Sequence, residues 1–215
     1  DPQLMSRIMN FAGQSQSLAL QVTVPGSSLT YLRATYRHKY FKPLFGGNLI
    51  IGLRGELGAI EAYGDTKVPP FFEHFYSGGV GSVRGFKQNT LGPRATPSPY
   101  YLDNEGEPLQ DENGEFIYNP YSYQDDRSIG GTYLLEGGID FIFKLPFLED
   151  QRSLRSSIFI DAGNVFAQEC KETQYNVNCS ELDIGELRYS FGFGVSWITQ
   201  LGPMSFAISK PFNQG

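Results

Sequence analysis

The sequence lacks a long apolar run. No stretch comes near the roughly 18 consecutive apolar residues of a candidate membrane helix, and the mean hydropathy is −0.29. A helix of about 20 apolar residues is needed to cross the hydrocarbon of a bilayer. A helical membrane span is therefore excluded, and any membrane role has to come from β-strands.

Charge is also sparse. Only 19% of the residues are charged, and the 17 Lys and Arg are scattered among 23 Asp and Glu, for a formal net charge of −6. Proteins that bind nucleic acid carry clustered basic residues on one face. Nucleic acid is therefore not an expected partner.

The chain has only two cysteines, Cys170 and Cys179, in a polar stretch that also contains Asn176 and Asn178. This arrangement favours a loop disulfide formed in an oxidising compartment, and two free thiols are the alternative. No histidine or further cysteine lies nearby to complete a metal site. We expect no metal and no other cofactor.

Alternation of apolar with polar or small residues is the dominant pattern, punctuated by 25 Gly and 13 Pro. A period of two residues indicates β-strands, and turn-like residues separate the runs, so the chain is predicted to be all-β and antiparallel. The clearest run sets large apolar residues against charged and small ones: Leu187, Tyr189, Phe191, Phe193, Val195 and Trp197 against Glu186, Arg188, Ser190, Gly192, Gly194 and Ser196. The other six runs cover about 17–24, 32–40, 48–57, 132–144, 157–162 and 204–209.

Strands of this kind are typical of a transmembrane β-barrel, with apolar side chains toward lipid and polar ones toward the lumen. A soluble β-sandwich has the same periodicity but buries its apolar face between two sheets. The many aromatic residues opposite charged ones favour the membrane interpretation. Since bacterial barrels close with an even number of strands, seven runs predict at least one further strand beyond this segment.

The predicted connections alternate between short and long, as in outer-membrane barrels. Short turns are expected near Lys42-Pro43, Pro146 and Leu201-Gly202-Pro203. The segments 64–128 and 168–185 are long, and we interpret both as extracellular loops. The first spans about 65 residues without sustained periodicity, a length that usually indicates a functional loop.

The long loop contains Val83-Arg84-Gly85-Phe86, an arginine between apolar and glycine neighbours. An arginine keeps its charge, so a buried one needs carboxylates and benefits from an aromatic face. Candidate carboxylates lie on the polar sides of two runs, at Glu136, Asp140 and Asp161. An exposed loop arginine and solvated acidic residues are the alternative interpretation.

This segment resembles the loop signature of the BamA/TamA superfamily of outer-membrane assembly and translocation proteins. Further similarities follow in the family's order, at Ile139-Asp140-Phe141, at 159–166, and from Leu201-Gly202-Pro203 to Lys210-Pro211-Phe212. The resemblance implies that residues 1–215 are the C-terminal portion of a sixteen-stranded barrel. It also implies that the loop folds into the lumen, where Arg84 pairs with the wall carboxylates.

The function implied by the resemblance is physical, and no enzyme activity is expected because no catalytic constellation accompanies the isolated His38 and His74. The expected role is to fold and insert β-barrel proteins into the bacterial outer membrane without ATP, through a lateral seam. The expected partners are the outer-membrane bilayer, unfolded outer-membrane proteins and the lipoproteins of an assembly machinery. Alternatives are a related barrel that translocates one partner or assembles autotransporters, and a passive porin.

Overall fold

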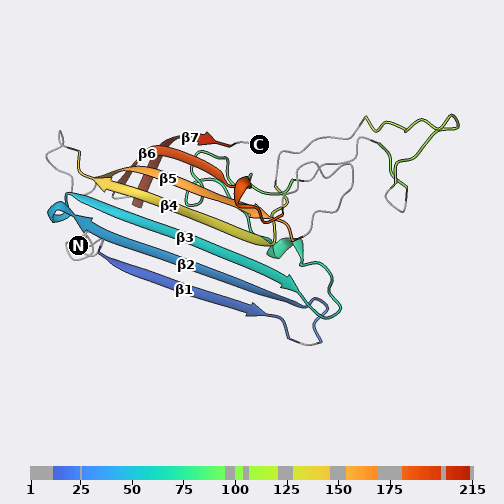
Figure 1. The fold of residues 1–215 in the computed structure, drawn as a ribbon, viewed down its shortest axis with the longest axis horizontal. Coiled ribbons are helices and arrows are strands. Elements are labelled where there is room, and N and C mark those ends of the chain that lie inside the picture. Colours follow the sequence, from blue (N-terminus) through green and yellow to red (C-terminus); the bar gives the residue numbers. More distant parts are fainter. Residues whose placement is uncertain are drawn as a thin grey trace.

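The seven alternating runs form seven strands of one antiparallel sheet, with each strand paired to its neighbours in chain order. The computed structural model describes residues 12–24, 26–94, 100–103, 107–120, 128–145, 154–168, 181–199 and 202–213. Figure 1 shows the strands side by side across the sheet. Their bounds are β1 Gly13–Val22, β2 Tyr31–Leu44, β3 Leu49–Ala62, β4 Tyr133–Phe143, β5 Leu154–Phe166, β6 Arg188–Thr199 and β7 Gly202–Phe212. The predicted all-β antiparallel fold is confirmed.

Three short 3-10 turns complete the secondary structure: η1 Phe45–Gly47, η2 Phe71–Glu73 and η3 Ile184–Glu186. No helix in the described ranges is long and apolar enough to span a membrane. The turn predicted near Lys42-Pro43 begins two residues later, because Pro43 pairs with Ile50 and β2 continues to Leu44. The turns predicted near Pro146 and Leu201 lie mainly outside the described residues.

The two faces of the sheet differ as the alternation predicts. We call the face that the long loop contacts the inner face and the opposite one the outer face. Large apolar side chains project from the outer face, where Ile208 is 82% exposed and Phe206, Ile160 and Leu57 are also exposed. Since the described residues contain a single sheet, these side chains are not buried in a β-sandwich.

The connections between neighbouring strands differ greatly in length. β2 and β3 are joined by a short connection, while a segment of about 70 residues separates β3 from β4. The two longest connections, β3–β4 and β5–β6, lie at the same end of the strands, and the β2–β3 turn lies at the other end, which we call the short-connection end. Long loops at one end are expected of bacterial outer-membrane barrels.

The loop between β3 and β4 begins on the inner face and then extends away from the sheet. Phe75 is buried with Tyr31, Ile60, Leu134 and Val165, and it pairs with Gly131 just before β4. Gly58 makes room for the Phe75 ring, because a Cβ at that glycine would lie 2.5 Å from Cζ of the ring. The start of the loop is thus packed into the small core of the molecule.

Further along, the loop forms an arm that Figure 1 shows reaching beyond the sheet. Three of its residues are joined in a cycle: Tyr101 N–H donates to Ile117 O (3.0 Å), Leu109 N–H to Tyr101 O (2.8 Å) and Ile117 N–H to Leu109 O (2.9 Å). The arm was not predicted, because its paired segments are too short to produce a recognisable alternation.

Candidate functional site: an arginine clamp on the inner face

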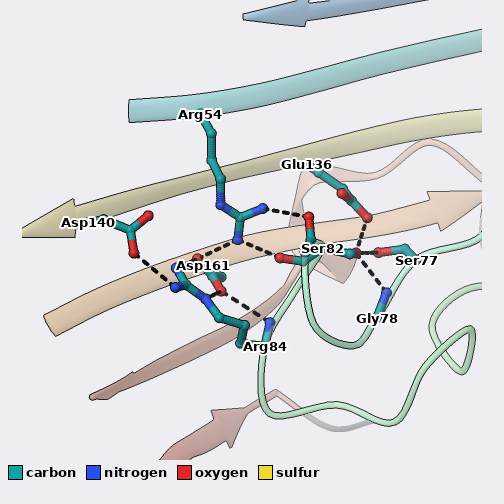
Figure 2. A network of polar contacts seen from close by, with 9 residues as sticks. Arg54, Ser77, Gly78, Ser82, Arg84, Glu136, Asp140 and Asp161 are labelled. Atoms are coloured by element: carbon teal, nitrogen blue, oxygen red, sulfur yellow. Dashed lines mark hydrogen bonds and ion pairs between the residues drawn. The ribbon is translucent and has the colours of Figure 1, made fainter. Parts of the chain in front are cut away.

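The signature segment lies against the inner side of β4 and β5 (Figure 2), and it also approaches β3, β6 and β7. Its backbone is folded on itself, since Gly79 N–H donates to Val83 O (3.1 Å) and Leu91 N–H donates to Ser77 O (3.2 Å). Gly85 has a φ of +97°, and a Cβ there would lie 2.8 Å from Oγ of Ser209 on β7. Only glycine therefore allows this close approach with this backbone conformation.

Arg84 is held by carboxylates from two neighbouring strands. Its Nε lies 2.6 Å from Oδ2 of Asp161 and its Nη2 lies 2.8 Å from Oδ1 of the same residue, a bidentate pair. Nη1 lies 2.9 Å from Oδ1 of Asp140, and the Arg84 backbone N–H also donates to Asp161 (3.1 Å). The structure thus brings together Arg84, Asp140 and Asp161, three of the residues expected from the sequence.

An aromatic ring completes the arginine site. The guanidinium carbon of Arg84 lies 3.5 Å from the ring centroid of Phe159, a fully buried residue of β5. Phe159 stands on the polar side of its alternating run, paired with Asp140 in the sheet register. The apparent exception to the alternation is therefore the surface on which the cation rests, an arrangement that favours binding through the ring quadrupole.

The environment of Arg84 secures its charge. Burial by itself would lower the pKa of the guanidinium, but the hydrogen bonds and charges of Asp161 and Asp140 outweigh burial and raise the pKa above its ordinary value. Asp161 has no exposed side-chain surface, whereas the Arg84 and Asp140 side chains are 17% and 18% exposed. The contact to Asp161 is the drier part of the site.

A second arginine, Arg54 of β3, shares Asp161 with Arg84. Its Nη2 lies 2.7 Å from Oδ1 of Asp161, and its guanidinium donates to the backbone oxygens of Gly81 (3.2 Å) and Ser82. Gly138 leaves space for this contact, since a Cβ there would lie 2.6 Å from the Asp161 carboxylate and 2.7 Å from Nε of Arg54. We call Arg54, Arg84, Asp140 and Asp161 the arginine clamp, in which two positive and two negative charges balance.

Sequence reasoning missed Arg54 as a ligand of the loop. The signal was its place on the polar side of an alternating run. What the sequence did not reveal was the register, which aligns Arg54 with Gly138 and Gly138 with Asp161 in one row across three strands.

Glu136 was expected to pair with Arg84, but it takes a different partner. Its carboxylate accepts a hydrogen bond from Oγ of Ser82, whose Oγ in turn accepts from the Gly78 N–H (2.9 Å) and lies 3.2 Å from Oγ of Ser77. The register explains the difference, because Glu136 pairs with Gly163 and Asp140 with Phe159, so the two carboxylates lie one inner-face row from Asp161 on opposite sides. Glu136 anchors the turn before the arginine.

The other signature residues pack around the clamp. Val83 is fully buried and packs against Gly163. The absence of a side chain at Gly163 makes room for it, because a Cβ there would lie 2.9 Å from Cγ2 of Val83. Phe86 is half-buried, with its Cβ close to Gly78. The small residues of the inner face thus form the surface against which the signature packs.

The remaining candidate residues do not form a second site in the described part of the chain. His74 places Nδ1 3.2 Å from the Ile129 carbonyl, and the described residues include no group of three or more metal-binding side chains. Cys170 and Cys179, expected to form a disulfide, lie outside the described residues.

Comparison with known proteins gives a consistent family. The model of the Omp85 superfamily domain matches residues 7–215. The chain is 34% identical over 212 residues to the outer membrane protein assembly factor BamA of Neisseria meningitidis serogroup B (strain ATCC BAA-335 / MC58), covering 90% of this chain and 23% of that protein.

A solved structure is also similar. The crystal structure of BamA from Haemophilus ducreyi lacking POTRA domains 1–3 superposes with a TM-score of 0.77 at 27% identity, covering 95% of this chain and 36% of that one. The chain therefore corresponds to less than half of each of these proteins.

Proposed function

The chain belongs to the Omp85 superfamily, and on that premise we propose that it forms part of the membrane barrel of an outer-membrane protein assembly factor. Such a factor folds and inserts other β-barrel proteins into the bacterial outer membrane without ATP and without chemical catalysis. The observation that carries the proposal is the arginine clamp, which ties the family's signature loop to the inner wall of the sheet.

The two faces of the sheet fit this role. The exposed apolar outer face suits contact with lipid, and the polar inner face suits a lumen in which the loop between β3 and β4 lies. We infer that the seven strands belong to a barrel of sixteen, the size expected from the family resemblance. The sheet edges then pair with further strands, since open edges in hydrocarbon leave backbone groups unpaired.

Arg84 acts in this proposal as a positioning residue rather than a group that touches substrate. All three of its guanidinium nitrogens contact carboxylates, and its face covers Phe159, so little of it is left to meet a passing ion or chain. This occupancy favours an assembly factor over a porin whose selectivity depends on Arg84. The clamp fixes the loop, and the loop fixes the shape of the wall.

The remaining parts of the proposal concern partners. Unfolded outer-membrane proteins would be the substrates, adding strands by backbone hydrogen bonding at a lateral seam of the complete barrel. The bilayer is the medium in which insertion occurs, and assembly lipoproteins would bind the complete protein.

The test uses the full-length protein, with any lipoproteins it requires, reconstituted in liposomes with a urea-denatured barrel substrate and no ATP. We expect Arg84→Ala to lower the folded fraction of substrate and to expose residues 77–92 to protease, because removing one partner of a buried pair costs several kcal/mol. Arg37→Ala is the matched control: Arg37 also pairs on the inner face, with Glu56 at 2.8 Å, but its side chain is 58% exposed. Wild-type substrate folding and loop protection in Arg84→Ala would contradict the role of the clamp, and failure of the wild-type protein to fold substrate would contradict the assembly function.

A further inference from the structure

A polar patch interrupts the apolar outer face near the short-connection end of β1 and β2. In the register, Lys42 and Tyr40 of β2 pair with Ile51 and Leu53 of β3, so the two strands differ in polarity at the same level of the sheet. β4 continues the apolar side, since Ile51 pairs with Phe141 and Leu53 with Ile139.

β1 extends the polar side in the other direction. Gln14 pairs with Tyr40 and Gln16 pairs with His38, so the two amides lie beside the two rings of β2. Both glutamines and Lys42 are exposed. We call Gln14, Gln16, His38, Tyr40 and Lys42 the outer polar patch.

Contacts within the described residues do not account for the patch. Lys42 has no ion pair there, and the buried Nδ1 of His38 has no hydrogen-bond partner there. Between β1 and β4 the described outer face carries one carboxylate, Glu61, which lies near the opposite end and is bonded to Tyr133 and Gln168. Within the described residues, the patch therefore presents one lysine charge and exposed amide donors without a balancing carboxylate.

The patch also reaches beyond the level of a membrane interface. Lys42 is close to the end of β2, whereas His38 lies four residues farther along the strand. Four residues span about 13 Å of strand, or about 10 Å across a bilayer at the usual barrel tilt. At this depth β3 and β4 present glycine on the outer face, since His38 pairs with Gly55 and Gly55 with Gly137. An unpaired polar group facing hydrocarbon is costly.

We propose that the outer polar patch binds the headgroup of an anionic phospholipid from the leaflet at the short-connection end. The phosphate would accept hydrogen bonds from the Lys42 ammonium and from the Gln14 and Gln16 amides, next to the His38 ring. A headgroup drawn to this depth would thin the leaflet locally beside β1 and β2. The inference rests on the family's placement of the sheet in the membrane and does not depend on assembly activity.

The test uses the full-length protein in nanodiscs of phosphatidylethanolamine and phosphatidylglycerol with a trace of phosphatidylglycerol carrying a photoreactive headgroup. After illumination, mass spectrometry locates the labelled peptides. We expect labelling of peptides from β1 and β2, and a drop of about fivefold or more in the double variant Lys42→Leu/Gln16→Leu. Lys39→Leu is the matched control, because Lys39 is an exposed lysine of the same strand that projects from the inner face; it should leave labelling unchanged.

Equal labelling of the wild type and the double variant would overturn the proposal. A second measurement decides the matter if the double variant does not fold. On the wild-type protein in nanodiscs that contain only phosphatidylethanolamine and the trace probe, added phosphatidylglycerol should compete with the probe, whereas added phosphatidylcholine should not. Equal competition by the two lipids would refute a site for anionic headgroups.

Discussion

Replacing Asp161 by asparagine tests the arginine clamp most directly. Four N–H groups converge on this one carboxylate: Nε, Nη2 and the backbone N–H of Arg84, and Nη2 of Arg54. The asparagine side chain would keep the shape of the aspartate, but its amide nitrogen would present donors to donors. Two guanidinium groups would then share the single remaining charge of Asp140.

The expected cost follows from burial. Breaking a buried ion pair by removing one partner costs about 3–5 kcal/mol. Asp140 is 18% exposed and contacts Arg84 through one nitrogen, so Asp140→Asn should cost only about 1–2 kcal/mol, between the values for an exposed pair and a buried one. Since 1.4 kcal/mol is a factor of ten, Asp161→Asn should open the loop at least roughly a hundred times more often, and Asp140→Asn about ten times.

Hydrogen exchange of the loop amides is the assay. The Gly79 and Leu91 N–H groups are bonded within the loop, and their exchange reports how often it opens. Exchange at a strand amide of β2, remote from the clamp, should be unchanged in both variants. The reasoning is refuted if the two asparagine variants exchange at the same rate, or if Asp161→Asn exchanges like the wild type.

Two further pairs of variants test how the loop fits the wall. Gly163→Ala should displace the signature and expose the loop to protease, because the new Cβ would lie 2.9 Å from both the Leu135 carbonyl and Cγ2 of Val83. Gly55→Ala is the control, because a Cβ there would have no heavy atom closer than 3.7 Å, and it should leave the loop as protected against protease as in the wild type. Equal protease sensitivity of the two variants would show that the glycine at 163 is not needed for close packing. Arg54→Ala should release the segment around Gly81 and Ser82 while leaving Arg84 on Asp161, so amide hydrogen exchange in that segment should increase by about tenfold. Arg54→Lys should restore the protection of these amides only in part, because lysine lacks the planar fork of arginine. Full rescue by lysine would mean that only the charge of Arg54 matters.

The sequence predicted the strands well because each one places different chemistry on its two faces. The run that became β6 alternates without interruption, and the observed strand starts and ends within two residues of the predicted run. The boundaries of β5 were harder, since Phe159 breaks the pattern and the predicted run covered only its middle. That break was itself a sign of the site, because a large aromatic residue on the polar side needs something polar to cover it.

The site was only partly predictable. The chemistry of Arg84 pointed to carboxylates and an aromatic face, but alternation gives the face of a residue and not its register with the next strand. Glu136 and Asp140 therefore looked equivalent, but they lie on opposite sides of the Asp161 row, so Glu136 contacts Ser82 and Asp140 contacts Arg84. The path of the loop depends on contacts between residues far apart in sequence, for which no local pattern exists.

The placement of Asp140 and Asp161 on adjacent strands makes the clamp a lock on strand alignment. Asp140 pairs with Phe159, so the side chains of Asp140, Phe159 and Asp161 surround one guanidinium only in the observed pairing. Sliding β4 along β5 by two residues would keep every backbone hydrogen bond possible and every side chain on its proper face, but it would carry Asp140 about 7 Å away from Arg84. A single arginine thereby distinguishes the native alignment from its nearest competitor, which the backbone alone cannot do.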